Sequence, residues 1–220
     1  MSMICPETYY EMNLKGKTAS QIMTAIRSLK REINRLKNTM EHPDYQPTIC
    51  PSEDVRISCS RDYLARAIKA LEDIGGTYTP TKAEQRAIRF DESIPYISKI
   101  EFCIGGFFDG YETRTYTLDD DKVHTEVEHS LILKPSNLED CSIEEMDKED
   151  FLDCLRDLHI GEWRANYDPK RFGYAVLDGT QWHLYVYFSN GQRPVKIEGS
   201  NDSPYNFKRL TELLEVTELD

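Results

Sequence analysis

Three side chains in the middle of the chain have residue types and a spacing that suit metal binding. His124, Glu126 and Glu128 alternate along a segment that we predict to be a β-strand, and alternate side chains project from the same face of a strand. Imidazole and carboxylate groups are ligands of zinc and related ions. The same residue types also occur on strand faces that water solvates, and no second ligand cluster accompanies them. We therefore predict a solvated strand face, with a metal-dependent enzyme as the alternative.

A second candidate metal site lies among the cysteines and histidines. His42, Cys50 and Cys59 follow one another, with seven and eight residues between them, and Cys5 lies near the start. Zinc sites use ligands in short pairs, which these spacings do not contain. Nucleophilic catalysis needs a cysteine or serine beside a base, but the six cysteines and five histidines are dispersed without a preferred pair. We therefore assign no catalytic, metal or cofactor-binding residue and favour a protein that is not an enzyme.

Three loops have compositions that bind ions in other proteins. The acidic turn at residues 119–121 lacks the alternating spacing and the distal glutamate of a calcium loop. Gly105-Gly106 lacks the Lys-Ser/Thr of a phosphate loop, which argues against nucleotide binding. Gly199-Ser200-Asn201 precedes a predicted helix and can present backbone N–H groups to an anion. The interpretation that we favour for this last segment is a turn that caps the helix.

The elements that position these residues begin with a predicted helical hairpin. Thr18 and Gln21 have the spacing of a capping box. Apolar residues then recur in alternating steps of four and three, as in a coiled-coil seam, at Ile22, Ile26, Leu29, Ile33, Leu36 and Met40. A second helix, from about Ser60 to Gly75-Gly76, can cover this stripe. Alternatively, a second copy of the chain can cover it, which would form a dimer through the helix over residues 18–40.

The segments around this hairpin predict connections. Residues 42–59 are rich in proline and polar side chains, with a short extended piece at residues 55–57. Residues 77–84 predict a linker, because Pro80 disfavours helix in the residue before it. We therefore place a boundary near residue 80, with a basic hairpin over residues 1–80 and an acidic domain over residues 81–220.

The second part predicts an antiparallel sheet. Alternating patterns indicate strands over residues 97–104, 111–118, 122–131, 182–188 and 195–197. Asn190-Gly191 predicts a type I′ turn between the last two strands. Helices are predicted from Ser142 or Asp147, with Phe151, Leu152, Leu155 and Leu158 inward, and from Ser203-Pro204 to Leu214. The predicted class is α+β, with an N-terminal antiparallel helical hairpin before a sheet of about five antiparallel strands and helices packed on one face.

Charge is distributed unevenly between these parts. The net charge is −12, with 14 basic and 11 acidic residues over 1–90 against 13 and 28 over 91–220. An acidic surface repels nucleic acid and favours basic partners, and it also keeps a protein in solution. The first predicted helix has a basic face made of Arg27, Lys30, Arg31, Arg35 and Lys37. The acidic half opposes duplex binding by this face, so the sequence argues against direct nucleic-acid binding.

The compartment is predicted from what the sequence lacks. No run approaches the roughly 20 apolar residues of a membrane span, and residues 1–7 lack the basic and then apolar layout of a secretory signal. The cysteines form no Cys-x-x-Cys pair, so free thiols are expected. We predict a cytoplasmic protein without membrane association.

Three segments resemble a known family. They are Leu-Lys-Asn-Thr-Met-Glu-His-Pro at residues 36–43, Val-Leu-Asp-Gly-Thr-Gln-Trp at 176–182 and Gly-Ser-Asn-Asp-Ser-Pro-Tyr-Asn-Phe at 199–207. In these segments the chain resembles a bacterial family of uncharacterised proteins associated with gut anaerobes and their mobile elements. The resemblance implies a bacterial origin and brings no known activity or catalytic residue with it.

These observations lead to three function hypotheses. The leading one is a non-enzymatic protein-interaction or regulatory protein, with a protein partner that can be a second copy of the chain. A narrower alternative is an anti-defence inhibitor from a mobile element, whose acidic surface blocks a nucleic-acid-binding effector. The third is a metal-dependent enzyme that uses His124, Glu126 and Glu128.

Overall fold

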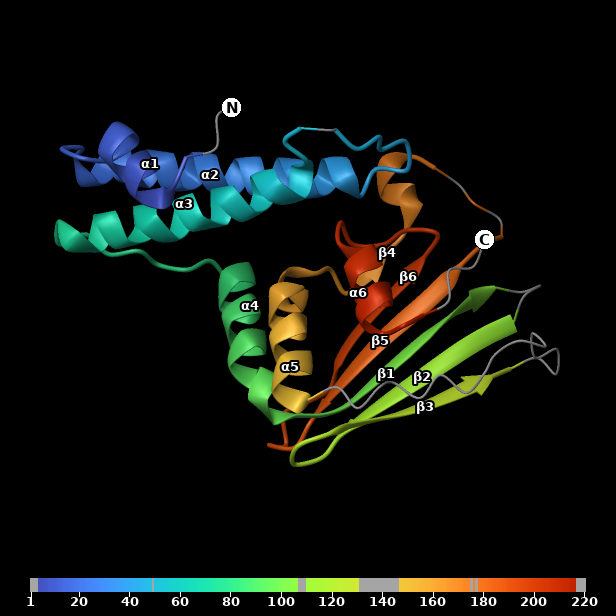
Figure 1. Cartoon of the computed structure of the whole chain (residues 1–220). Coiled ribbons are helices and arrows are strands. Elements are labelled where there is room, and N and C mark those ends of the chain that lie inside the picture. The colour runs from blue at the N-terminus through green and yellow to red at the C-terminus, as the bar shows by residue number, and fades with distance from the viewer. Residues whose placement is uncertain are drawn as a thin grey trace. The chain divides into compact units, whose positions relative to one another are not determined.

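The computed structural model in Figure 1 describes residues 4–48, 50–106, 110–130, 147–174, 176 and 178–216. The chain divides into two units, Met1–Pro80 and Thr81–Asp220, each with its own hydrophobic core. The first unit is helical, and the second combines helices with a six-stranded sheet. The α+β class predicted from the sequence is confirmed.

The apolar stripe of the first unit lies on α2 (Ala19–Met40), which packs along α3 (Glu53–Asp73) in Figure 1. The predicted capping box starts α2, because the Thr18 N–H donates to Gln21 Oε1 at 2.9 Å and the Gln21 N–H donates to Thr18 Oγ1 at 3.4 Å. All stripe residues except the half-buried Met40 are buried, and each contributes roughly 1.5–3 kcal/mol. The chain therefore covers its own stripe, and a dimer through residues 18–40 stays a prediction.

The second long helix begins earlier than predicted. α3 starts at Glu53 rather than near Ser60, so the extended piece predicted at residues 55–57 was wrong. Ser52 caps the helix, with its hydroxyl accepting from the Val55 N–H at 3.5 Å. Acidic residues in the first turn favour a helix start, and Ile57 is buried. The cap and the tertiary packing thus outweigh the proline-rich context.

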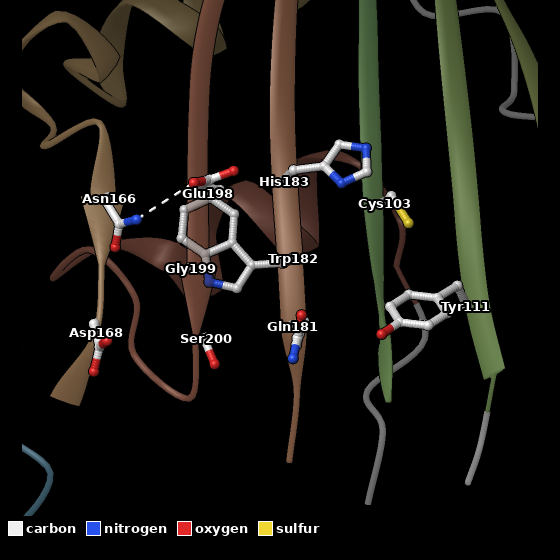
Figure 2. Close-up of a pocket in the computed structure, with 10 residues that line it drawn as sticks. All are labelled: Cys103, Tyr111, Asn166, Asp168, Gln181, Trp182, His183, Glu198, Gly199 and Ser200. Carbon is white, nitrogen blue, oxygen red and sulfur yellow. Dashed lines mark hydrogen bonds between the residues drawn. The ribbon is translucent and has the colours of Figure 1, made fainter. Parts of the chain in front are cut away.

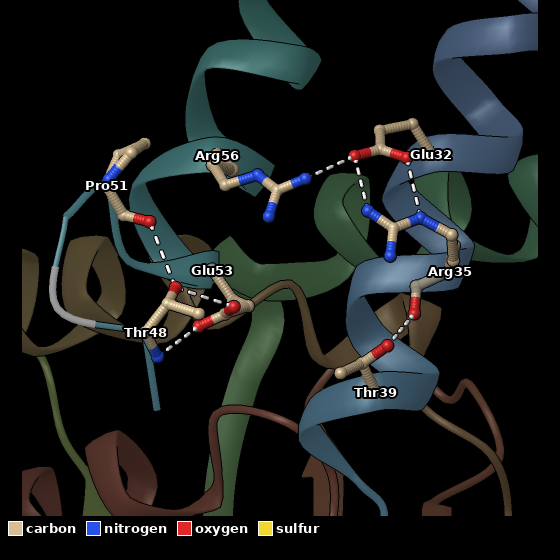
Figure 3. A network of polar contacts seen from close by, with 7 residues as sticks. All are labelled: Glu32, Arg35, Thr39, Thr48, Pro51, Glu53 and Arg56. Atoms are coloured by element: carbon tan, nitrogen blue, oxygen red, sulfur yellow. Dashed lines mark hydrogen bonds and ion pairs between the residues drawn. The ribbon is translucent and has the colours of Figure 1, made fainter. Parts of the chain in front are cut away.

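A buried carboxylate closes the connection between the two helices (Figure 3). Glu53 is 4% exposed, and its carboxylate accepts hydrogen bonds from the Tyr45 hydroxyl at 2.7 Å, the Thr48 N–H at 3.2 Å and the Thr48 hydroxyl at 2.7 Å. Burial opposes ionisation, but these hydrogen bonds prevail and lower the pKa of Glu53 to about 2. The connection is therefore tied to the first turn of α3.

A further helix, α1 (Pro6–Asn13), was not predicted. Its Tyr9 ring stacks on Tyr63 of α3 with ring centres 4.4 Å apart. The Tyr63 hydroxyl donates to the Ile4 carbonyl at 2.6 Å, and Leu14, directly after the helix, is buried. The helix has no apolar stripe of its own, since it has no buried residue, and its place depends on these contacts with α3.

The second unit is built on a mostly antiparallel sheet with the strand order β3-β2-β1-β5-β6-β4. The strands are β1 (Ile97–Gly106), β2 (Gly110–Leu118), β3 (Val123–His129), β4 (Asn166–Tyr167), β5 (Gln181–Phe188) and β6 (Val195–Ser200). Five strands pair antiparallel with their neighbours, as predicted. The two-residue β4 adds a parallel pairing to β6, which raises the strand count to six.

Helices cover one face of this sheet, as predicted (Figure 1). They are α4 (Lys82–Ser93), α5 (Lys148–Asp157) and α6 (Phe207–Leu213), with the 3-10 turns η1 (Ile94–Tyr96), η2 (Ile160–Glu162) and η3 (Pro169–Phe172). Their buried residues form one core with alternate strand residues. The four predicted inward residues of the helix after Asp147 are all buried. The side chains between those strand residues form the other, polar face.

Three local predictions in this unit were wrong. The linker over residues 77–84 contains the start of α4, whose capping box joins the Thr81 N–H to Glu84 Oε2 at 2.8 Å. The last helix begins at Phe207 instead of at Ser203-Pro204. The hairpin after β5 has no type I′ turn, because Asn190 is not among the residues with positive φ. Pro194 has no N–H for a ladder hydrogen bond, and β6 begins directly after it.

Some predicted features lie outside the described residues. These are Leu131 at the end of the predicted third strand, Cys141, and Ser142 as an alternative helix cap. Asp147, the other predicted cap, accepts from the Glu149 N–H at 2.7 Å. None of the described helices combines the length and the apolar composition that crossing a membrane requires.

Candidate functional site

The predicted metal row lies on the edge strand β3. His124 Nε2 is 3.1 Å from Asp119 Oδ2, while Glu126 and Glu128 are exposed along the strand. Successive side chains on one strand face are nearly 7 Å apart, which is wide for a shared ion. Within the described ranges, no three His, Cys, Asp or Glu side chains are grouped closely enough to hold a metal ion.

The structure does not bring the predicted cysteine and histidine ligands together. Cys5 is the N-cap of α1, where its thiol accepts from the Thr8 N–H at 3.5 Å. Cys50 is exposed, and Cys59 lies half-buried within α3. His42 follows the end of α2, and its Nδ1 accepts from the Asp44 N–H at 3.2 Å. These four residues therefore do not form a common ligand set in the structure.

Gly199-Ser200-Asn201 is not a helix cap, so that interpretation was wrong. Gly199 and Ser200 belong to β6, and α6 begins only at Phe207. A Cβ at Gly199 would lie 2.3 Å from Trp182 Nε1. The glycine therefore makes room for the Trp182 ring, and its position supports no anion site at this helix.

The basic face of α2 is partly neutralised within its own unit. Arg35 donates two hydrogen bonds to the Glu32 carboxylate, each of 2.8 Å, and Arg56 of α3 donates to the same carboxylate at 2.8 Å (Figure 3). Lys30 Nζ is 3.1 Å from the Tyr78 hydroxyl. These contacts reduce the positive potential that the sequence suggested for this face.

The polar face of the sheet brings three chemically active residues into one row. Cys103 of β1 is paired with His183 of β5, and His183 is paired with Glu198 of β6. Paired residues on neighbouring strands have Cβ atoms about 4.5–5.5 Å apart. Figure 2 shows all three on the same face, with the His183 ring projecting from β5 towards β1. We call these residues the Cys-His-Glu row.

The row lines a cavity of about 400 Å³ near one end of the strands, together with Tyr111, Gln181 and other polar residues. Burial lowers the pKa of His183, although the carboxylates of Glu101 and Glu198 act in the opposite direction. The His183 imidazole is therefore neutral near pH 7. Glu101 Oε1 lies 4.0 Å from His183 Nε2, and Glu198 accepts from Asn166 Nδ2 at 3.3 Å.

A second cavity of about 720 Å³ lies along β6 and α4. We call it the α4-β6 groove. Its apolar lining consists of Phe90, Ile160, Trp163, Val195 and Ile197, and its basic lining consists of Arg86, Arg89, Arg193 and Lys196. None of the described residues that line it is acidic. The basic edges contrast with the acidic composition of residues 91–220, which supply Arg193 and Lys196.

Short-range contacts fix the walls of the α4-β6 groove. Arg86 donates to the Trp163 carbonyl at 2.7 Å. The Ser93 hydroxyl lies 2.6 Å from both the Arg89 carbonyl and Gln192 Oε1, which joins the end of α4 to the hairpin after β5. At Gly161, a Cβ would lie 2.8 Å from Ala87 Cα. The groove is therefore largely preformed.

One wall of the groove is the outer edge of β6, which among the described residues has a neighbouring strand along only part of its length. β5 pairs with Val195–Ser200 on one side, whereas β4 pairs on the other side only with Glu198 and Gly199. The Glu198 N–H points to that outer side, since it donates to the Ala165 carbonyl at 3.1 Å. Backbone groups alternate in direction along a strand. The N–H and C=O of Lys196 therefore also point outward, into the groove.

Comparison with protein-family models, curated proteins and solved structures finds no match for this chain.

Sequence reasoning missed both the Cys-His-Glu row and the α4-β6 groove. Cys103 and His183 are 80 positions apart, and only the pairing of β1 with β5 makes them neighbours. The alternation in both strands does indicate that each residue lies on the polar face. The strand order, which the sequence does not state, is needed to place them together.

Proposed function

We propose that this chain is a protein-interaction protein that binds an extended, acidic and apolar segment of a partner in the α4-β6 groove. The observation that carries this proposal is the groove itself, with its apolar floor and its basic edges. Concave apolar sites with a few directed polar groups are the usual places for ligand binding. The groove would thus serve a regulatory or adaptor role and would not catalyse a reaction.

Charge complementarity argues for an acidic occupant. Arg89 and Arg193 are exposed at the groove edges. Arg86 is engaged with a carbonyl, and Lys196 Nζ lies 4.9 Å from the centre of the Tyr185 ring. The two exposed guanidinium groups can each take a carboxylate in a bidentate pair. A basic occupant would be repelled by these cations, and no acidic side chain among the described lining residues would offset that repulsion.

Backbone geometry argues for an extended occupant. An added strand would receive a hydrogen bond from the Lys196 N–H and donate one to the Lys196 C=O, in the manner of peptide addition to a sheet edge. Each such bond contributes about 0.5–1.5 kcal/mol net. Alternate side chains of the added strand would face the apolar floor. The edge is short, so side-chain contacts must supply much of the affinity.

The test uses two defined probes, a fluorescent octapeptide of alternating valine and glutamate and its valine-lysine counterpart. We expect the acidic peptide alone to bind, with an affinity that falls as salt rises. Arg89→Glu should weaken its binding by about tenfold or more, since it replaces an attraction by a repulsion. Arg209→Glu, which changes an exposed arginine on α6, is the matched control and should bind normally. Equal binding of both peptides, or equal loss in both variants, would contradict the proposal.

The acidic surface supports a second candidate, an anti-defence inhibitor that occupies the basic channel of a nucleic-acid-binding effector. Its supporting observation is the exposed acidic edge of the sheet at Glu126, Glu128 and the turn before β3. The test is competition, in which the chain displaces duplex DNA from such an effector at low salt. Glu126→Lys combined with Glu128→Lys should abolish displacement, whereas Arg89→Glu should not. Displacement that is insensitive to salt would exclude this candidate.

A further inference from the structure

A buried thiol faces the cavity on the polar side of the sheet, away from the α4-β6 groove. Cys103 is 7% exposed, and it lines the cavity beside His183 (Figure 2). Among the described residues, no hydrogen-bond partner is found for its sulfur. The lining of this cavity is mostly polar, with amide, hydroxyl, imidazole and carboxylate side chains beside the Trp182 residue.

We propose that Cys103 accepts an acyl group from a small, polar acyl donor, with His183 as the proton acceptor. This activity goes beyond partner binding in the α4-β6 groove and uses a different part of the unit. The supporting geometry is the register of three neighbouring strands, which places the thiol, the imidazole and the Glu198 carboxylate in one row. A cysteine, a base and a carboxylate near the base are the parts of an activated nucleophile, and Glu101 Oε1 also lies 4.0 Å from His183 Nε2.

The reaction conserves atoms and electrons without an added oxidant or reductant. The Cys103 sulfur attacks the carbonyl carbon of an ester or thioester, and His183 takes the thiol proton. A sulfur-carbon bond forms, the bond from that carbon to the leaving alcohol or thiol breaks, and His183 passes the proton to the leaving group. The product is an S-acyl cysteine. Hydrolysis of this thioester by water returns the free thiol and releases a carboxylic acid.

The surroundings of the row suit this transfer. The groups that face His183 are the carboxylates of Glu101 and Glu198, the Cys103 thiol, and the Tyr185 ring, whose centre is 4.6 Å from the imidazole centre. The two carboxylates stabilise the imidazolium that forms when the proton arrives. Gln181 and Tyr111 line the same cavity and carry N–H and O–H donors for the developing oxyanion.

The experiment treats the full chain with p-nitrophenyl acetate and measures the acetyl adduct on each cysteine by peptide mass spectrometry. Cys154 on α5 is exposed and serves as an internal reference in the same molecule. We expect Cys103 to be acetylated at least tenfold faster than Cys154, despite its burial. Between pH 7 and pH 8 the Cys103 rate should change little, because burial holds the pKa of His183 below its ordinary value and the neutral imidazole removes the thiol proton across this range.

Two variants distinguish assistance by His183 from simple accessibility of the thiol as the cause of Cys103 acetylation. His183→Gln should slow acetylation of Cys103 by about 100-fold, the usual contribution of a general base, and leave Cys154 unchanged. Cys154→Ser should leave Cys103 acetylation unchanged. If Cys103 reacts more slowly than Cys154 in the unaltered chain, the proposal is overturned without any variant. An unchanged Cys103 rate in a folded His183→Gln protein would also overturn it.

Discussion

At the scale of single residues, the buried carboxylate of Glu53 holds the connection between α2 and α3. Three donors from Tyr45 and Thr48 converge on it. Replacing it with glutamine keeps the shape but removes the charge that these donors stabilise. We expect Glu53→Gln to lower the free energy of unfolding of the first unit by about 1–3 kcal/mol at pH 7, as measured by urea denaturation.

The pH dependence of this effect has a definite sign. The pKa of Glu53 is about 2 in the folded chain and 4.5 ordinarily. A lowered folded pKa contributes stability that is full above the ordinary value and is lost as the pH falls towards 2. The difference between the unaltered protein and Glu53→Gln should therefore shrink between pH 5 and pH 2. A difference that grows on acidification would contradict this account of Glu53.

His183 should also make the folded state less stable as the pH falls, but for another reason. Burial lowers its pKa from the ordinary 6.5, so below that value the unfolded chain binds the proton more readily than the folded chain. The folded state is therefore penalised as the pH falls through 6.5. As the pH is lowered from 7.5 to 5, we expect the melting temperature of His183→Gln to rise relative to that of the unaltered protein. Parallel dependence of the two melting temperatures on pH across this range would refute a half-buried, neutral imidazole.

At the scale of elements, the α2-α3 contact depends on its apolar stripe. Leu29→Asp combined with Ile33→Asp would bury charges against α3 without partners, which costs several kcal/mol. We expect loss of helical signal in far-UV circular dichroism from the first unit. Arg27→Gln combined with Arg31→Gln, two exposed positions on the same helix, is the matched control and should retain the signal.

The approach of η2 to α4 shapes the floor of the groove. A methyl group on Gly161 would lie 2.8 Å from both Ala87 Cα and Phe90 Cβ. Gly161→Ala should therefore destabilise the second unit by about 1–3 kcal/mol, as overpacking does, and weaken acidic-peptide binding. Ala165→Ser, at an exposed residue of the same groove, should do neither. Normal melting and binding in Gly161→Ala would show that the groove floor is not set by this contact.

The elements that the sequence predicted best are those in which local signals agree. In α2, the capping box and a long apolar stripe point to the same helix. In α4, the box at Thr81 and Glu84 stands beside Pro80, and only Ala87, Phe90 and Ser93 of its residues are buried. Its periodicity is therefore weak. At α6 the sequence signal was misleading. Pro204 is typical of a helix start, but it lies in a turn before the helix, which begins at Phe207.

At the scale of the whole molecule, summed charge conceals local sign. Residues 91–220 carry 13 basic and 28 acidic side chains, yet Arg193 and Lys196 of that range line a groove with basic edges. Arg89 comes from α4 and Arg193 from the hairpin that precedes β6, more than 100 positions later. A count of charges along the sequence does not show that these two arginines are neighbours in the fold. The candidate sites were for this reason beyond reach of the sequence, whereas the fold class was not.

The most direct test of the groove is a backbone amide measurement by nuclear magnetic resonance during titration with the acidic octapeptide. We predict that the amide signals of Lys196 and Ile197 shift and that the Lys196 N–H becomes protected from hydrogen exchange, since the peptide accepts a hydrogen bond from it. The amides of the α2-α3 hairpin should not shift. Shifts confined to β3, or binding without protection of the Lys196 amide, would contradict an occupant added at the β6 edge.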